Sequence, residues 1–463
     1  MQGSFDLYMQ EHRQEMIDAL RALVKHPSVR RVSSPNAPFG QPVADALHTY
    51  LDLAKSFGFT TKNFNYFAGT VEWGGPAKLG ILSHLDVVPE GTGWTYPPFN
   101  VTEQEGYLYG RGVIDDKGPT IAALFALKAI KDLQIPLKKG VRLIVGCSEE
   151  TGGEDMDYYK ECEPFPPLLF TPDGDFPVIN IEKGRFYPVF TANLAKTAAP
   201  CAVKEIHAGT VVNAVPETAT AILHGISVEE IKQTIDHLGT HGLSFSFEES
   251  DYTLQMTVSG TAAHASTPEK GVNALTGLLK ILSALDLDRC DSTEAIQMLA
   301  KWFPFGDVFG EALGLACQDE CSGSLTCVLS CLIMTEDRLE AQIDIRFPLV
   351  CTKESLEKSF KSFEETSLFT ITTTGVDPHH VPADSPFVRT LLDIYESVTG
   401  DAGCPIAIGG GTYVHGIPNA VAFGAEYPGD DNHMHGADER LAIDKWLQTA
   451  TIYAQTIYTL CSE

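Results

Sequence analysis

Residues 80–89 read GILSHLDVVP, and this stretch decides how the rest of the chain is interpreted. Apolar residues lead to His84 and Asp86, and Pro89 then ends the segment. Residues i and i+2 of an extended strand point to the same side, so these two polar side chains share one face at a predicted strand end. One imidazole nitrogen of His84 can bind a metal ion while Asp86, or a neighbour, accepts the proton-bearing nitrogen. The alternative is a surface histidine and aspartate that bind nothing.

Length, composition and charge restrict the class of protein. The 463 residues suffice for about two or three domains. The composition, with 44% hydrophobic and 20% charged residues, is typical of a globular protein. The formal net charge of −28 argues against nucleic acid or an anionic membrane as a partner, because both bind basic surfaces. The start has no signal-peptide core and no apolar run is long enough to span a membrane, so we expect a soluble cytoplasmic protein.

The cysteines favour reduced thiols over a disulfide framework, because 11 of them are scattered along a long chain. One cluster comprises Cys317, Cys321, Cys327 and Cys331. A structural zinc site usually pairs its ligands more tightly than this cluster does. We instead expect Cys327 and Cys331 on one face of a buried strand, TCVLSCLIM.

Two sequence patterns indicate the domain organisation. Residues 65–185 alternate between predicted strands and helices, which is typical of an α/β domain with a mixed or parallel sheet. Residues 186–383 are richer in Thr, Ser and Ala with short β-like runs, so we predict an inserted α+β domain. The first pattern then returns and ends in a helix predicted over residues 440–460. We therefore expect one discontinuous domain of residues 1–185 and 384–463.

Acidic residues occur at the ends of several predicted elements of the first domain. Asp115 and Asp116 precede an Ala/Leu-rich helix, whose N-terminal dipole favours anions. Glu149 and Glu150 follow the apolar run VRLIVGC, and Asp173 follows another such run. The simpler interpretations are that the aspartates cap the helix and that the glutamates lie in a solvated acidic loop. Ligands in α/β domains bind at the carboxyl ends of strands, however, which favours one shared site.

With a histidine from the segment HMHGADE, the candidates form one set of nitrogen and oxygen donors: His84, Asp115, Glu149, Glu150, Asp173 and His435. Such donors without cysteine are typical of catalytic zinc, manganese or cobalt. The set suffices for two ions about 3.5–4 Å apart, which suits a hydrolase. Two divalent ions, three ligating carboxylates and a bridging hydroxide are together neutral. Glu149 is then free to act as a general base.

Nine motifs occur in order along nearly the whole chain: HLDVVP, GRGVIDDKGP, SEETGG, TPDGDFPVINIEKG, NAVPE, SGTAAHASTPEKG, DIRFP, GGGTY and HGADE. This series resembles the dinuclear-metal exopeptidase family of carboxypeptidase G, acetylornithine deacetylase, succinyl-diaminopimelate desuccinylase and carnosinase. Within it, the series is most similar to the bacterial dipeptidase V branch. The resemblance implies an α/β, mixed-sheet catalytic domain with an inserted α+β lid domain.

The resemblance also implies a role for each ligand. Asp115 would bridge two ions, His84 and Asp173 would hold one of them, and Glu150 and His435 the other. The ions would be zinc, with manganese or cobalt as alternatives.

Two further residues of the same domain take roles from the resemblance. Glu149 would act as general base and proton shuttle, and Asp86 would orient His84. The peptide bond between Asp115 and Asp116 would be cis, a rare form for a bond that does not precede proline.

The resemblance marks four positions for substrate binding, three in the inserted domain and one, Gly410, in the returning part of the first domain. His264 is similar to a lid histidine that hydrogen-bonds the oxyanion, and Asn213 to an accompanying substrate contact. Arg346 is similar to the group that pairs with the substrate's terminal carboxylate, which suits the bidentate geometry of arginine. Gly410, in a glycine-rich loop, would offer a backbone N–H to the same carboxylate. On spacing alone, Asn213, His264 and Arg346 would each be structural residues.

The expected function is metal-dependent hydrolysis of dipeptides that carry free amino and carboxyl termini. The inserted domain is long enough to supply its own histidine by closing at a hinge near Gly184 and Val381, so we expect a monomer, with a homodimer as the alternative. Deacylation of N-acyl amino acids and a non-catalytic metal-binding scaffold stay open as alternatives.

Overall fold

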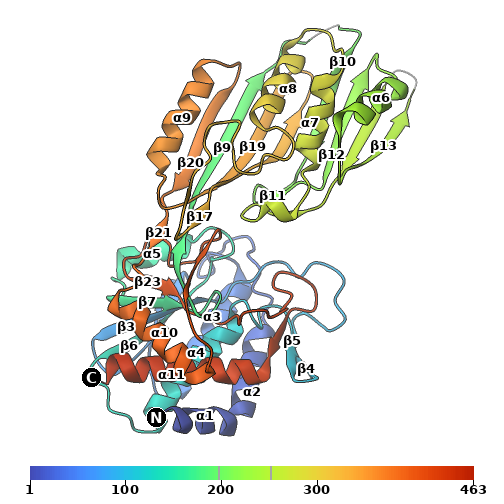
Figure 1. The fold of residues 1–463 in the computed structure, drawn as a ribbon. Helices are drawn as coiled ribbons and strands as arrows, with labels where there is room; N and C mark the ends of the chain where they lie inside the picture. The colour runs from blue at the N-terminus through green and yellow to red at the C-terminus, as the bar shows by residue number, and fades with distance from the viewer. Residues whose placement is uncertain (197–198, 251–252, 463) are drawn as a thin grey trace. The chain divides into compact units, whose positions relative to one another are not determined.

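The computed structural model describes the chain except residues 197–198, 251–252 and 463 (Figure 1). The chain folds into two compact units, each with its own hydrophobic core. Unit 1 comprises Met1–Ile181, His380–Ile406 and Gly411–Glu463, and unit 2 comprises Glu182–His379 and Ala407–Gly410.

The central sheet of unit 1 is mixed, as predicted. Its strand order is β1-β2-β6-β3-β7-β23-β8-β21, with β22 beside β8. β3 runs parallel to both β6 and β7, while β2 pairs with β1 and β6 in the antiparallel sense. The strands are β1 Thr60–Phe64, β2 Ala68–Trp73, β3 Ala77–His84, β6 Gly140–Gly146, β7 Leu168–Thr171, β8 Val178–Glu182, β21 His379–His380, β22 Pro405–Ile408 and β23 Ala420–Ala422.

The parallel strands of this sheet bring distant residues to one edge. His84 is the last residue of β3 and is paired with Gly146 at the end of β6. Glu149 and Glu150 follow β6 closely, and Asp173 follows β7. Parallel neighbours end at the same side of a sheet, so these side chains meet there.

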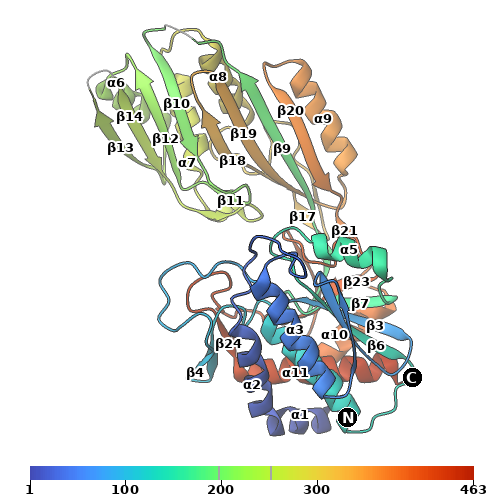
Figure 2. The same cartoon turned by 180° about the vertical axis from the view of Figure 1, so that it is seen from behind.

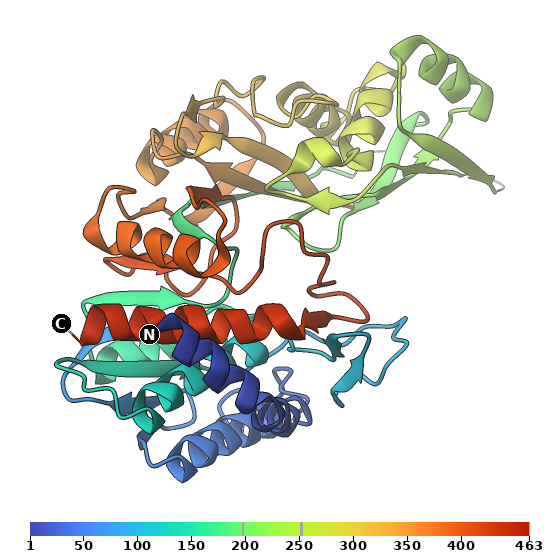
Figure 3. The same cartoon turned by 60° about the horizontal axis from the view of Figure 1, so that its bottom comes forward.

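Helices pack around this sheet because packing buries their apolar faces away from water. α4 (Lys117–Asp132) is buried along almost its whole length and contacts α11 (Ile443–Cys461). Figure 3 shows α11 running through unit 1 with α1 (Gln2–Glu11) beside it. The other helices are α2 Arg13–Val24, α3 Gln41–Ser56, α5 Glu154–Cys162 and α10 Pro386–Thr399.

The predicted C-terminal helix begins later than expected. Arg440–Ala442 form β24, which pairs with β5 (Tyr107–Tyr109) in a small sheet completed by β4 (Thr102–Gln104). The expected start at residue 440 is therefore wrong. Pairing with β5 holds these three residues extended before helix α11 begins.

Unit 2 contains an eight-stranded antiparallel sheet in the order β13-β14-β12-β10-β18-β19-β9-β20. Figures 1 and 2, seen from opposite sides, show three helices over one face of this sheet: α7 (Ala274–Ala284), α8 (Asp291–Trp302) and α9 (Lys353–Glu365). The alternating burial along β9 fits a sheet with one covered face. The strands are β9 Gly184–Asn193, β10 Ala202–Ala208, β12 Thr218–His224, β13 Ser244–Glu249, β14 Leu254–Ser259, β18 Thr326–Met334, β19 Arg338–Phe347 and β20 Thr370–Val376.

Smaller elements complete unit 2. They are α6 Val228–Leu238, α7 Ala274–Ala284, α8 Asp291–Trp302, α9 Lys353–Glu365, the 3₁₀ turn Pro268–Lys270, the pair β11 Ala214–Val215 and β15 Ala263–His264, and the pair β16 Gln318–Asp319 and β17 Gly323–Ser324.

The cysteines differ from the prediction in two ways. Cys317 and Cys351 form a disulfide, so not all the thiols are free. Cys327 is buried, whereas Cys331 lies beyond a β-bulge between Leu329 and Cys331 that shifts the pairing of β18 with β19. The extra residue reverses the alternation of faces, so the expectation of one shared face is wrong. Among the described residues, no cysteine belongs to a group able to hold a metal ion.

No helix within the described part of the chain has the length and apolar character needed to cross a membrane.

Candidate metal centre

Unit 1 brings the six predicted donors together as two groups of three. One group is His84, Glu149 and Asp173, and the other is Asp115, Glu150 and His435. Within each group the ligand atoms lie within 4.8 Å of one another. Glu149, predicted as a base rather than a ligand, lies in the first group beside His84 and Asp173.

Asp115, a member of the second group, also contacts His84 of the first. Its Oδ1 is 3.0 Å from Nε2 of His84, and its Oδ2 is 2.7 Å from Nε2 of His435. Each oxygen of one buried carboxylate therefore faces a different histidine. The peptide bond from Asp115 to Asp116 is cis, as the resemblance implied.

Asp86 joins His84 to the two glutamates. The Nδ1 atom of His84 is 3.0 Å from the backbone carbonyl oxygen of Asp86 and 3.5 Å from its Oδ1. The Asp86 carboxylate also accepts the backbone N–H groups of Glu149 and Glu150, each at 3.1 Å. A proton on Nδ1 leaves the lone pair of Nε2 directed at Asp115, the tautomer that a metal ligand needs.

Sequence reasoning missed the side chains that support these loops. Asp155 is buried in the first turn of α5 and accepts the backbone N–H of Ser148 at 2.9 Å and the hydroxyl of Tyr413. The Tyr413 ring stands edge-on to that of His84, with centroids 6.2 Å apart. Tyr413 lies in the motif GGGTY, which was a signal for it. For Asp155, the sequence offered no signal beyond its position after the motif SEETGG.

Burial and crowding of carboxylates shift the acid equilibria. Burial, reinforced by the charge of Asp115, raises the pKa of Asp173 to about 7. Burial likewise raises the pKa of Glu149 well above its usual range. Burial acts to raise the pKa of Asp115, but the neighbouring imidazoles of His435 and His84 outweigh it and hold this pKa well below the usual value. A hydrogen bond to Asp115 raises the pKa of His435 to about 10. The site therefore favours added positive charge.

The donors fit divalent metal ions. In the described chain, His84 Nε2 and Glu150 Oε1 are buried without a hydrogen-bond partner, although a buried polar atom normally has one. Both atoms belong to the two donor groups. Imidazole and carboxylate donors suit zinc and manganese, and two cations would compensate the crowded carboxylates.

Unit 2 brings its four predicted residues onto neighbouring elements. Asn213 directly precedes β11, and His264 pairs with Ala214 across β11 and β15. The Nδ1 atom of His264 lies 2.7 Å from the Ser266 hydroxyl.

Arg346, near the end of β19, has a fixed guanidinium. It donates to both carboxylate oxygens of Asp344, each at 2.6 Å, and to the carbonyl of Gly409 at 3.0 Å. The last bond fixes Arg346 beside the segment that contains Gly410.

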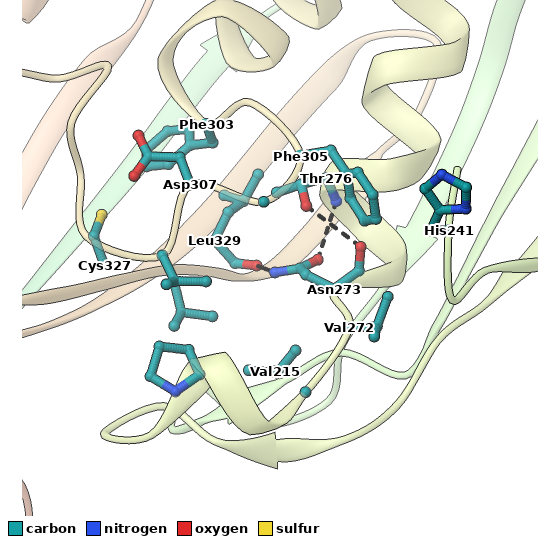
Figure 4. A pocket seen from close by; sticks show the side chains of 15 residues that line it. Val215, His241, Val272, Asn273, Thr276, Phe303, Phe305, Asp307, Cys327 and Leu329 are labelled. Atoms are coloured by element: carbon teal, nitrogen blue, oxygen red, sulfur yellow. Dashed lines mark hydrogen bonds between the residues drawn. The ribbon is translucent and has the colours of Figure 1, made fainter. Parts of the chain in front are cut away.

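A separate pocket of about 130 Å³ lies within unit 2 (Figure 4). The residues that line it are mainly apolar. The side-chain amide of Asn273, which also lines the pocket, is hydrogen-bonded within the protein. This side chain donates to the carbonyl of Leu329 and accepts the N–H of Thr276, each at 3.0 Å. The residues described around this pocket include no metal-ligating group.

Comparison with known proteins identifies the family of the chain. Residues 80–459 match the model of peptidase family M20/M25/M40. The chain belongs to this peptidase family. This membership confirms the resemblance read from the nine motifs.

Relatives of this M20 peptidase include the "Putative dipeptidase YtjP" of Bacillus subtilis, 38% identical over 92% of this chain and 93% of the relative. The "Beta-Ala-Xaa dipeptidase" of Lactobacillus delbrueckii subsp. lactis is 34% identical over 92% of this chain and 91% of its own. The crystal structure of human carnosine dipeptidase 1 aligns with a TM-score of 0.61, covering 99% of this chain and 98% of that one. At 14% sequence identity, the last comparison confirms the fold alone.

Proposed function

We propose that this M20 peptidase is a metal-dependent dipeptidase that cleaves the peptide bond of dipeptides with free amino and carboxyl termini. The observation that carries the proposal is the pair of donor groups that Asp115 joins, with Glu149 among them. The names of the two curated relatives, both dipeptidases, support the substrate class.

Five residues would hold two divalent ions in this proposal. His84 and Asp173 would bind one ion, and Glu150 and His435 would bind the other. Asp115 would be a ligand of both. Zinc is the proposed metal, with manganese or cobalt as alternatives, because the donors are nitrogen and oxygen without sulfur. Bound ions of this kind polarise a scissile carbonyl and lower the pKa of water.

Glu149 is the proposed general base. Its carboxylate lies beside His84 and Asp173, and its raised pKa suits a group that takes a proton from water and later returns it. In the second step Glu149 passes that proton to the leaving amine. Asp86 keeps Glu149 in place through the backbone N–H of that residue.

We assign substrate binding by unit 2 as part of the same proposal. His264 and Asn213 would contact the oxyanion and the scissile region, and Arg346 with the Gly410 N–H would bind the terminal carboxylate. The bonds of Arg346 to Asp344 and Gly409 support this role, because they hold the guanidinium rigid before substrate arrives. A monomer is the proposed working form.

The test is hydrolysis of a small dipeptide panel by metal-stripped protein, with zinc, manganese or cobalt added back, beside Glu149→Ala. N-acetyl and N-succinyl amino acids are assayed in parallel. Metal-restored dipeptide cleavage that disappears in the variant supports the proposal. Cleavage of the acyl amino acids alone would replace it with a deacylase. Two bound ions without any cleavage would indicate a non-catalytic scaffold.

A further inference from the structure

A buried ion pair joins two parts of unit 1 that are far apart in sequence. Arg111 Nη1 and Glu439 Oε2 lie 2.5 Å apart, and their side chains are 1% and 0% exposed. Arg111 lies in the motif GRGVIDDKGP and Glu439 ends the motif HGADE. Neither residue belongs to the metal-donor groups.

Glu439 holds the segment that leads into α4. Its Oε1 accepts the backbone N–H groups of Gly112 at 2.9 Å, Ile114 at 3.0 Å and Asp115 at 3.4 Å. These residues form turns and lie outside the strands, so no sheet neighbour takes their N–H groups. One carboxylate oxygen supplies the acceptor instead, and it fixes the backbone of the shared donor Asp115.

Arg111 holds the segment that carries the other donor. Its Nη2 donates to the carbonyls of His435 at 3.2 Å and Gly436 at 3.1 Å. Longer bonds of 3.4 Å reach the carbonyls of Pro89 and Glu90. The Arg111–Glu439 pair therefore connects the backbone of Asp115 to the backbone of His435.

The two donor groups depend on this pair to different extents. His84 is held by β3, which pairs with β6 and β7 on its two sides, and Asp173 closely follows β7. Asp115 and His435 lie outside the helices and strands, and His435 has a left-handed backbone with φ of 60°. Sheet pairing does not position them, and the bonds of Arg111 and Glu439 are among those that hold their backbone instead.

Stability alone does not account for a buried ion pair. Removing two charges from water is costly, and apolar residues of similar volume often stabilise a protein equally well or better. Apolar residues cannot, however, donate to two carbonyls and accept from three N–H groups. The function that only the charged pair performs is positioning.

We propose that Arg111 and Glu439 are positioning residues that set Asp115 against His435 and thereby determine the metal affinity of the Asp115, Glu150 and His435 group. The inference rests on the metal centre proposed above. It predicts that loss of the pair weakens the Asp115, Glu150 and His435 site more than the His84 and Asp173 site, which shares only Asp115 with it.

Binding of Zn²⁺ or Mn²⁺ to the full chain, measured by equilibrium dialysis, tests this inference. His84→Ala leaves the His435 group as the intact site, and His435→Ala leaves the His84 group. Adding Glu439→Gln to His84→Ala should weaken binding at least about tenfold, one step of about 1.4 kcal/mol. Adding it to His435→Ala should weaken binding less, by under about threefold or about 0.7 kcal/mol, because Asp115 is the one member of that site whose backbone Glu439 holds.

Two further variants separate positioning from folding. The double variant Arg111→Met with Glu439→Leu removes both buried charges, so it should fold by circular dichroism and still lose the His435-group ion. Glu72→Gln is the control for loss of an ion pair away from the donors, because Glu72 pairs with Arg142 at 2.5 Å in unit 1 and its described side-chain bonds reach no donor residue. It should leave both sites unchanged.

Distinct results overturn the inference. Equal weakening of both sites by Glu439→Gln, or unchanged binding of two ions by the double variant, would refute a positioning role. A double variant that does not fold would assign the pair to stability and refute it too. Failure of the proposed function looks different: wild type would bind two ions and Glu439→Gln would lose one, but no dipeptide would be cleaved.

Discussion

Replacing Asp173 by asparagine should stabilise the metal-free protein and destabilise the metal-loaded one. Burial, the first cause, together with the charge of Asp115 raises the pKa of Asp173 from 3.8 to about 7. Without metal at neutral pH, the folded state must therefore either keep a proton on this carboxyl or bury its charge among other acids, and both cost free energy relative to the unfolded chain. Asparagine has nearly the same shape and no charge, so it removes that cost.

The magnitude follows from the shift in pKa. About three pKa units at about 1.4 kcal/mol each correspond to roughly 4 kcal/mol. Because the folded carboxyl keeps its proton to higher pH, the unfolded chain ionises first as the pH rises from about 4 to 7, and stability falls over that range. In chelator, Asp173→Asn should match wild type near pH 4 and exceed it by up to about 4 kcal/mol above pH 7.

Guanidinium unfolding followed by tryptophan fluorescence measures this difference. The chain has 4 tryptophans, of which Trp302 lies in unit 2. A Trp302→Phe background therefore restricts the signal to unit 1. Each variant is measured at acid and neutral pH, first with chelator and then with zinc.

The control is Asp157→Asn, because Asp157 is 78% exposed on α5 and pairs only with Lys160 of the same helix among the described ion pairs. It should change stability by less than about 0.5 kcal/mol under every condition. The reasoning is refuted if Asp173→Asn destabilises the protein in chelator at neutral pH. Failure of zinc to reverse the sign would exclude Asp173 as a ligand.

Three other variants test separate parts of the site. Glu149→Gln should lower kcat by a factor of about 10²–10⁴ while two ions stay bound. Steady-state kinetics and metal analysis measure these two quantities, and an unchanged kcat would show that Glu149 is not the general base. Arg346→Lys should raise KM for dipeptides several-fold but not for dipeptide amides, which lack the carboxylate, and equal effects on both would argue against carboxylate binding. Gly146→Ala should cost about 1–3 kcal/mol on denaturation, because its Cβ would collide with Tyr413 Oη and Asp155 Oδ2. A neutral result there would mean that the end of β6 can move.

The donors could be found from sequence because each follows a local signal. An apolar run of strand length predicts a strand, and the polar residue that ends it predicts a position at the sheet edge. His84, Glu150 and Asp173 were found in this way. Asp115 and His435 have weaker local signals, and their assignment depended on the order of the motifs.

The supporting side chains were missed because their partners are distant in sequence. Arg111 and Glu439 are separated by 328 residues. Neither is preceded by a pattern that distinguishes it from a surface charge. Their burial follows from the meeting of two irregular segments, which no local periodicity encodes. The same limit applies to Tyr413 and Asp155, which are 258 residues apart.

The errors in the prediction have one physical source. The strand around Cys327 and Cys331 was predicted correctly, but a single inserted residue at the bulge reversed which face Cys331 occupies. Alternation predicts faces only while the register is continuous, and the register depends on the neighbouring strand. The Cys317–Cys351 disulfide likewise joins residues 34 positions apart. Sequence pattern therefore identifies the donors that the fold brings together, whereas the geometry between them depends on pairings that only the folded chain defines.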